Sequence, residues 1–231
     1  MYSDIQQKIR KLLSLRNLDP DKASIKTMIM YSGGADSLSL AKNILECTKH
    51  KIFIHHVVLK NFEERDEFQL NVLKNQLEFL KKVREFQFIQ SSTEMKIDSS
   101  DYKYVGLDLT TSLFMGGRSC LALKNQISAI YTGHLLATTA AELFEGISVF
   151  NALFTNRRFK PNWLIPFRSL DQRSAKLKIY ESIGKDGLAL TVSCRSPSKS
   201  EGQFSSCGKC HACATRRKAI ENLGWDMSLV K

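Results

Sequence analysis

Residues 32–37, Ser-Gly-Gly-Ala-Asp-Ser, bring two glycines, an acid and two hydroxyls together directly after a short apolar run. Gly33 and Gly34 allow a close backbone approach and positive φ values, and backbone N–H groups at a helix start attract anions. The hydroxyls of Ser32 and Ser37 can donate to phosphate oxygens. Asp36 suits a Mg²⁺ ion that bridges phosphates, or a helix cap. The stretch predicts a phosphate-binding turn, with an ordinary strand-to-helix turn as the alternative.

The glycine turn differs from the P-loop of kinases. That motif needs a lysine and then a serine or threonine directly after its second glycine, and neither Gly33 nor Gly34 is followed by lysine. The sequence therefore excludes a P-loop of that type at this turn.

The second cluster of chemistry-bearing residues lies near the C-terminus, where one cysteine, a gap of twelve residues and three closely spaced cysteines follow one another: Cys194, Cys207, Cys210 and Cys213. Thiolates at this spacing can converge on one tetrahedral ion, and four of them leave no open position for a catalytic water. This predicts a structural zinc site. An iron–sulfur cluster is the main alternative, and His211 could replace one thiolate.

These two motifs resemble those of known enzymes. Residues 32–37 are similar to the pyrophosphate-loop (PP-loop) signature of the N-type ATP pyrophosphatases, and the pair formed with "CGKCHACATRRKAIENLG" resembles the 7-cyano-7-deazaguanine synthase family. The resemblance implies ATP, magnesium and zinc as cofactors. It also implies that a 7-carboxy-7-deazaguanine-like carboxylate is adenylated and converted with ammonia to the amide and the nitrile, with release of AMP and pyrophosphate, as in queuosine biosynthesis. Asp36 would hold magnesium in that reaction.

Two further residues enter through the resemblance. Arg118 in "MGGRSC" matches an arginine that the family carries in a glycine-containing turn, where it could pair with ATP phosphates; a solvated arginine is the alternative. Gly133 and His134 resemble the glycine and histidine of tRNA-modifying relatives, in which this strand end lies near ATP. A histidine that only caps the strand is the alternative there.

The acceptor is left open, because residues 133–154 lack the substrate loop of the synthase family. A tRNA-modifying PP-loop adenylase is the first alternative. A diverged synthase-like protein of a viral or antiviral system, which joins the base to a macromolecule, is another. A zinc-stabilised nucleotide-binding module without turnover is a third.

The elements that must position these residues follow from apolar periodicity. It predicts strands over 25–31, 51–59, 85–90 and 129–134, and helices over 3–13, 36–47, 64–83, 119–128, 174–183 and 215–224. Alternating strands and helices predict an α/β fold with a doubly wound parallel sheet, which the resemblance makes adenine nucleotide alpha hydrolase-like. We expect an ATP-binding domain over 1–155 and a small zinc-binding subdomain over 156–231.

Composition adds expectations about partners and location. The chain of 231 residues carries a formal net charge of +11, which suits RNA, another macromolecular acceptor or a nucleotide triphosphate; a lysine-rich surface without such a partner is the alternative. No apolar run approaches the roughly 20 residues of a membrane helix, and the N-terminus lacks the pattern of a signal peptide. A cytoplasmic protein with no membrane partner is expected, with a homodimer left open.

Overall fold

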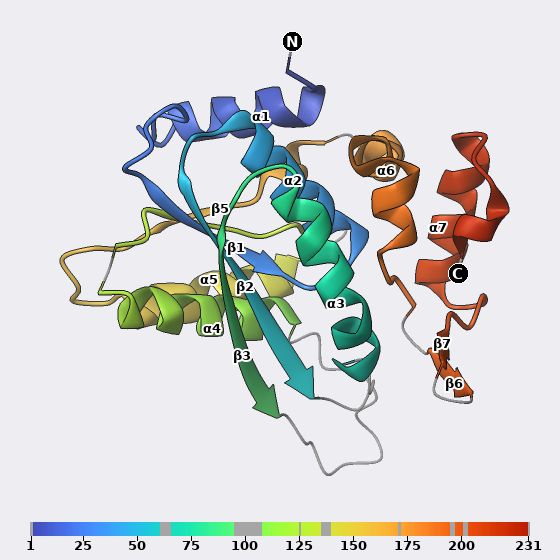
Figure 1. Cartoon of the computed structure of the whole chain (residues 1–231). Coiled ribbons are helices and arrows are strands. Elements are labelled where there is room, and N and C mark those ends of the chain that lie inside the picture. Colours follow the sequence, from blue (N-terminus) through green and yellow to red (C-terminus); the bar gives the residue numbers. More distant parts are fainter. Residues whose placement is uncertain are drawn as a thin grey trace.

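The protein is built around one parallel sheet (Figure 1). The structure, a computed structural model, describes residues 2–60, 66–94, 108–124, 126–134, 140–170, 172–194, 197–200 and 203–230. The five strands pair in the order β3-β2-β1-β4-β5, all parallel. They are β1 (Lys26–Tyr31), β2 (Lys51–Lys60), β3 (Gln87–Glu94), β4 (Ala129–Tyr131) and β5 (Asn162–Leu164). The predicted α/β class is confirmed.

Helices cover both faces of the sheet. One face carries α1 (Asp4–Ser14), α2 (Ala35–Cys47), α3 (Asp66–Lys81) and α6 (Gln172–Ala189), and the other carries α4 (Asp108–Ala122) and α5 (Ala140–Leu153). Alternate β1 side chains explain this: Ile29 and Tyr31 pack with the first set, Met28 and Met30 with the second. The chain crosses from one side of β1 to the other between β3 and β4, and ligands of such sheets bind outside the strands' carboxyl ends at this reversal.

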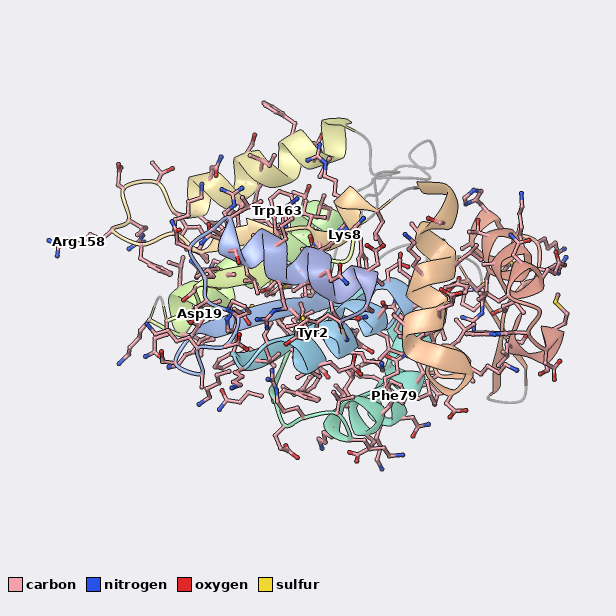
Figure 2. All side chains as sticks on the ribbon, turned by 90° about the horizontal axis from the view of Figure 1, so that it is seen from above. Tyr2, Lys8, Asp19, Phe79, Arg158 and Trp163 are labelled. Atoms are coloured by element: carbon pink, nitrogen blue, oxygen red, sulfur yellow. The ribbon has the colours of Figure 1, made fainter. Side chains whose placement is uncertain are left out.

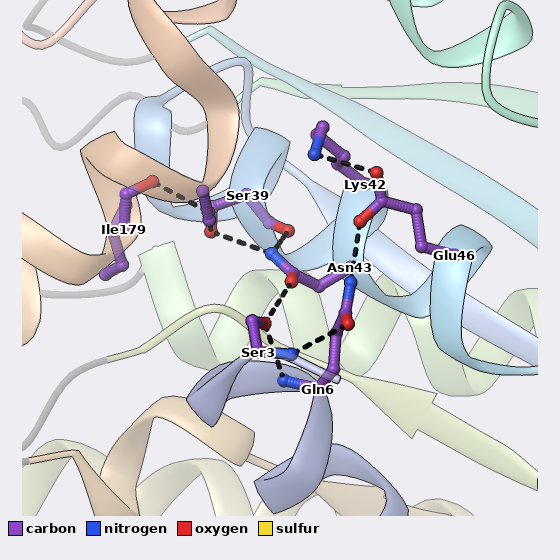
Figure 3. Close-up of polar contacts among 8 residues, drawn as sticks. Ser3, Gln6, Ser39, Lys42, Asn43, Glu46 and Ile179 are labelled. Carbon is purple, nitrogen blue, oxygen red and sulfur yellow. Dashed lines mark hydrogen bonds and ion pairs between the residues drawn. The ribbon is translucent and has the colours of Figure 1, made fainter. Parts of the chain in front are cut away.

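Polar contacts fix α2 between α1 and α6 (Figure 3). Ser3 caps α1, and its hydroxyl donates to the Asn43 side-chain oxygen at 3.4 Å. The Asn43 amide donates to the Ser39 carbonyl at 2.8 Å, and the hydroxyls of Ser39 and Ser182 are 2.6 Å apart. Because Ser39 and Asn43 are buried, their pairing favours one placement of α2 against both neighbours.

The structure differs from the sequence prediction at α4. A helix was expected over 119–128, after the glycine pair, but the helix runs from Asp108 to Ala122 and contains Gly116 and Gly117. A Cβ at Gly116 would lie 2.7 Å from Met30 Sδ, and one at Gly117 would lie 2.5 Å from Leu153 Cδ1. The glycines therefore permit close packing of α4 on β1 and α5 and do not end a helix, so this prediction was wrong.

The C-terminal residues form a smaller unit beside α6 (Figure 1). A 3₁₀ helix (Pro166–Ser169) leads into α6, which bends at Gly184, where φ is +70°. The hairpin of β6 (Ser198–Ser200) and β7 (Gln203–Ser205) follows, then α7 (His211–Asn222) and a 3₁₀ helix (Met227–Val230). β5 lies beyond residue 155 and yet pairs with β4, so segment 156–231 completes the main sheet; the domain boundary itself stays a prediction. None of the described helices combines the length and apolar character needed to cross a membrane.

Candidate functional site

The predicted phosphate loop lies between β1 and α2, at the carboxyl end of the middle strand. Gly33 has φ +78°, a conformation that glycine adopts without a steric penalty. Gly34 is the N-cap of α2 in extended conformation, and no side chain caps the helix. The alternative prediction from the sequence, that Asp36 caps α2, is therefore wrong. The first-turn N–H groups of α2 have no partners within the helix, and this end of a helix attracts anions.

The two serines hold the loop together. The Ser37 hydroxyl accepts from the Ser32 N–H at 3.3 Å and donates to the Gly34 carbonyl at 2.9 Å. Ser37 is buried, whereas Ser32 is exposed on the loop. Ser37 thus braces the turn in this structure; phosphate contacts from either hydroxyl stay a prediction.

Asp36 has a partner that the sequence prediction missed. Lys176 of α6 places its Nζ 2.6 and 2.7 Å from the two carboxylate oxygens of Asp36, and both side chains are about one-third exposed, at 30% and 29%. The ion pair puts a cation at the mouth of the predicted phosphate loop. The only sequence signal for it was a lysine inside the helix expected over 174–183.

Gly133 joins the loop from β4. A Cβ at this position would lie 3.3 Å from the carbonyl carbon and oxygen of Asp36 and 3.4 Å from the backbone nitrogen of Ser37. The strand end and the start of α2 therefore meet closely, as expected for two elements at one edge of a parallel sheet. Contacts of Gly133 or His134 with ATP stay a prediction.

Arg118 lies within helix α4 and not in the glycine-containing turn that was expected. It is exposed, and the glycines before it belong to the same helix, α4. Gly117 beside it packs on Leu153, the last residue of α5. A catalytic role for Arg118 stays a prediction.

The four C-terminal cysteines converge as predicted. Their Sγ atoms all lie within 4.8 Å of one another, and Cys194 and Cys213 are buried. A zinc ion with Zn–S bonds of about 2.3 Å needs sulfur atoms about 3.8 Å apart at the corners of a tetrahedron, so the donor set and its spacing fit. His211 begins α7 with an exposed side chain, and four thiols are already gathered without it.

Backbone groups near the cluster favour the thiolate form of Cys207, which is the form that binds metal ions. Backbone N–H groups of Lys209 and Cys210 lower the pKa of the Cys207 thiol, since they donate to its sulfur. Burial raises the pKa of Cys213 to about 12. A metal ion must displace the Cys213 proton, which makes binding at this site pH-dependent.

Comparisons with known proteins fit this fold. No model of a known protein family matches the chain, and no curated protein matches its sequence. Among solved structures, the U34-tRNA thiolase NcsA from Methanococcus maripaludis, determined with its [4Fe-4S] cluster, is similar at a TM-score of 0.50 and 17% identity, over 98% of this chain and 76% of the thiolase. A predicted subunit of a tRNA methyltransferase from Methanocaldococcus jannaschii is similar at a TM-score of 0.36 and 11% identity, over 89% and 91%.

The likeness to the thiolase shows the fold alone, and the second likeness carries no argument. The predicted α/β architecture is thus supported by the structure and by a comparison that spans nearly the whole chain. Membership of the 7-cyano-7-deazaguanine synthase family stays a prediction from the two motifs.

Proposed function

We propose that this protein is an ATP-dependent adenylating enzyme of the PP-loop type that acts on tRNA. The observation that carries the proposal is the turn at Gly33 and Gly34, with Asp36 in the first helical turn after it, at the carboxyl end of β1. This is the place and backbone geometry in which parallel α/β proteins bind phosphates.

The residues of the loop have separate tasks in the proposed reaction. N–H groups in the first turn of α2 hold the β and γ phosphates and stabilise the charge that develops on pyrophosphate as it leaves. Asp36 would hold magnesium, which would supply positive charge to neutralise and align the phosphates. The Lys176 Nζ is 2.6 Å from Asp36 Oδ1, so its positive charge would also act on phosphates bound at this loop. An oxygen of the acceptor attacks the α phosphorus, and no side-chain nucleophile is needed.

Charge at several places on the surface favours an RNA acceptor. The net charge is +11; Lys8 lies on α1, whereas Arg158 projects at the end of the molecule opposite α7 (Figure 2). Exposed basic residues also include Arg157 and Lys160, in the same connection between α5 and β5. A ligand as large as tRNA can contact such separated charges at once, whereas a free nucleotide cannot. The solved thiolase with a similar fold is itself a tRNA enzyme.

A second candidate function rests on the spacing of the four cysteines. Cys194, Cys207, Cys210 and Cys213, together with the glycine turn, resemble the 7-cyano-7-deazaguanine synthase family. In that case the adenylated group is the carboxylate of 7-carboxy-7-deazaguanine and the nitrogen comes from ammonia.

One assay separates the two functions. Purified protein is given magnesium and ATP labelled in the α phosphate, with total tRNA, with 7-carboxy-7-deazaguanine plus ammonia, or with neither. In the tRNA reaction we expect release of pyrophosphate and transfer of the α-phosphate label to tRNA as its adenylate, with a rate that falls steeply as salt rises. AMP release that needs the base would favour the second candidate. ADP as the product, or AMP release that ignores both additions, would contradict both.

We infer zinc for the cysteine site on the basis of sulfur spacing. In a [4Fe–4S] cluster each thiolate binds a different iron atom, and in a [2Fe–2S] cluster the two pairs of thiolates bind different irons, so the four sulfurs stand farther apart than around a single ion. All four Sγ atoms lie within 4.8 Å of one another, which favours a single ion. Metal analysis and the visible spectrum of aerobically and anaerobically purified protein test this: zinc gives no visible absorbance, and an iron–sulfur cluster does.

A further inference from the structure

Gln76 of α3 is a fully buried amide beside the phosphate loop, and the proposed chemistry gives it no role so far. Its Nε2 donates to the Gly33 carbonyl at 2.9 Å and to the Leu190 carbonyl at 2.6 Å. Its Oε1 accepts from the Tyr31 hydroxyl at 2.7 Å. Both donors of this amide and one acceptor position are thus directed at the loop, at the strand before it or at the segment after α6.

The contact with Gly33 sets the direction of a neighbouring donor. In a trans peptide the N–H points opposite to the C=O of the same unit. Because the Gly33 carbonyl points toward buried Gln76, the Gly34 N–H points away from Gln76. On the proposed function, this N–H is a donor to the phosphates at the start of α2.

The contact with Leu190 ties the same amide to the segment that enters the cysteine cluster. Residues 188–194 run past the loop, and the Val192 carbonyl would lie 3.7 Å from a Cβ at Gly34. The segment ends at Cys194, one of the four clustered thiols.

Arg216 holds two further carbonyls of this segment. It is 2% exposed and lies one helical turn after Cys213. Its guanidinium donates to the Leu188 carbonyl at 2.7 Å and to the Thr191 carbonyl at 3.0 Å. Residues 188–194 have little freedom to shift, because a shift would break their hydrogen bonds to the buried Arg216 guanidinium.

We propose that Gln76 is a positioning residue for the nucleotide: it orients the Gly33–Gly34 peptide, and through Leu190 it couples that peptide to the segment held by Arg216 and the cysteine cluster. The proposal rests on the proposed function, because it assumes that the loop binds the ATP phosphates. It adds that the packing of the C-terminal unit, which contains the cysteine cluster, sets the affinity for ATP.

Calorimetric binding of Mg-ATP to the metal-loaded full chain tests the proposal. Gln76→Met keeps the volume and removes all three hydrogen bonds; Gln76→Glu keeps the acceptor for Tyr31 and removes both donors. We expect each to raise the Kd for ATP about tenfold, the usual effect of one lost buried hydrogen bond. Thr48→Val is the matched control, since it removes a buried hydrogen bond at the far end of α2, 2.9 Å long to the Ile44 carbonyl. It should lower stability and leave the Kd within about twofold.

A double-mutant cycle tests the coupling. Arg216→Lys keeps the charge and loses the fork of donors, so it should also weaken ATP binding; in the Gln76→Met background it should add little, because the link is already broken. A Kd in both Gln76 variants equal to that of the wild type would overturn the positioning role while leaving the proposed function intact. Fully additive effects of the two substitutions would overturn the coupling. Failure of the wild type to bind Mg-ATP would overturn the proposed function and this inference with it.

Discussion

At the scale of single residues, our proposal assigns magnesium binding to the Asp36 carboxylate, which pairs with Lys176 in this structure. We expect Asp36→Asn to lower kcat/KM for ATP about a hundredfold and to raise the magnesium concentration needed for half-maximal pyrophosphate release, since an amide binds the ion weakly. Asp21→Asn removes a carboxylate that pairs with Arg10 at 2.6 Å, away from the loop, and serves as the control. An unchanged magnesium dependence in Asp36→Asn would remove the support for the metal role.

A second residue-scale prediction concerns buried His55 of β2. Burial lowers the pKa of His55 to about 4 from its ordinary 6.5. Between these values the unfolded chain takes up a proton at this position and the folded chain does not, so the free energy of unfolding falls as pH drops from 6.5 to 4, by up to about 3 kcal/mol. Urea unfolding at pH 7 and pH 4.5 should therefore show a smaller acid loss for His55→Gln than for the wild type. Equal losses would contradict this account.

At the scale of elements, the turn between β1 and α2 depends on the positive φ of Gly33, +78°. Gly33→Ala should cost about 1–2 kcal/mol of stability because a Cβ is strained there, and it should also weaken ATP binding because the loop shifts. Gly224 follows α7 with φ +61° and nothing within 4 Å of an added Cβ, so Gly224→Ala is the matched control for backbone strain alone. Thermal unfolding and ATP titration of both variants measure the two effects. Equal ATP affinity in the two variants would contradict ATP binding by the loop at Gly33.

The local sequence pattern was sufficient to predict the elements around the glycine turn and the cysteine cluster. The apolar run before Ser32 and the periodicity after it predicted β1 and α2, and cysteine spacing predicted the cluster. Gly116 and Gly117 were misread as a break between elements. Their role is to permit close packing against Met30 and Leu153, and these residues lie far away in the sequence. Lys176 and Gln76 were missed for the same reason: nothing in their neighbours along the chain shows that the fold brings them to residues 33–36.

At the scale of the whole molecule, the cysteine site should stabilise the C-terminal unit. We expect Cys213→Ser to lower the bound metal per chain and to reduce the free energy of unfolding by about 3 kcal/mol or more, since a ligand that binds only the folded state adds to its stability. Cys120→Ser changes a buried cysteine outside the cluster and should keep its metal. Metal analysis with chemical unfolding gives both quantities, and full metal content in Cys213→Ser would contradict the assigned ligand set.

The most direct test of the central claim is a crystal structure with magnesium and an ATP analogue that cannot be cleaved between the α and β phosphates. The account predicts that the β and γ phosphates lie against Gly33, Gly34 and the first turn of α2, with a magnesium ion on Asp36 and the α phosphorus open to the acceptor. A triphosphate bound elsewhere, with the Asp36–Lys176 ion pair unchanged, would contradict it.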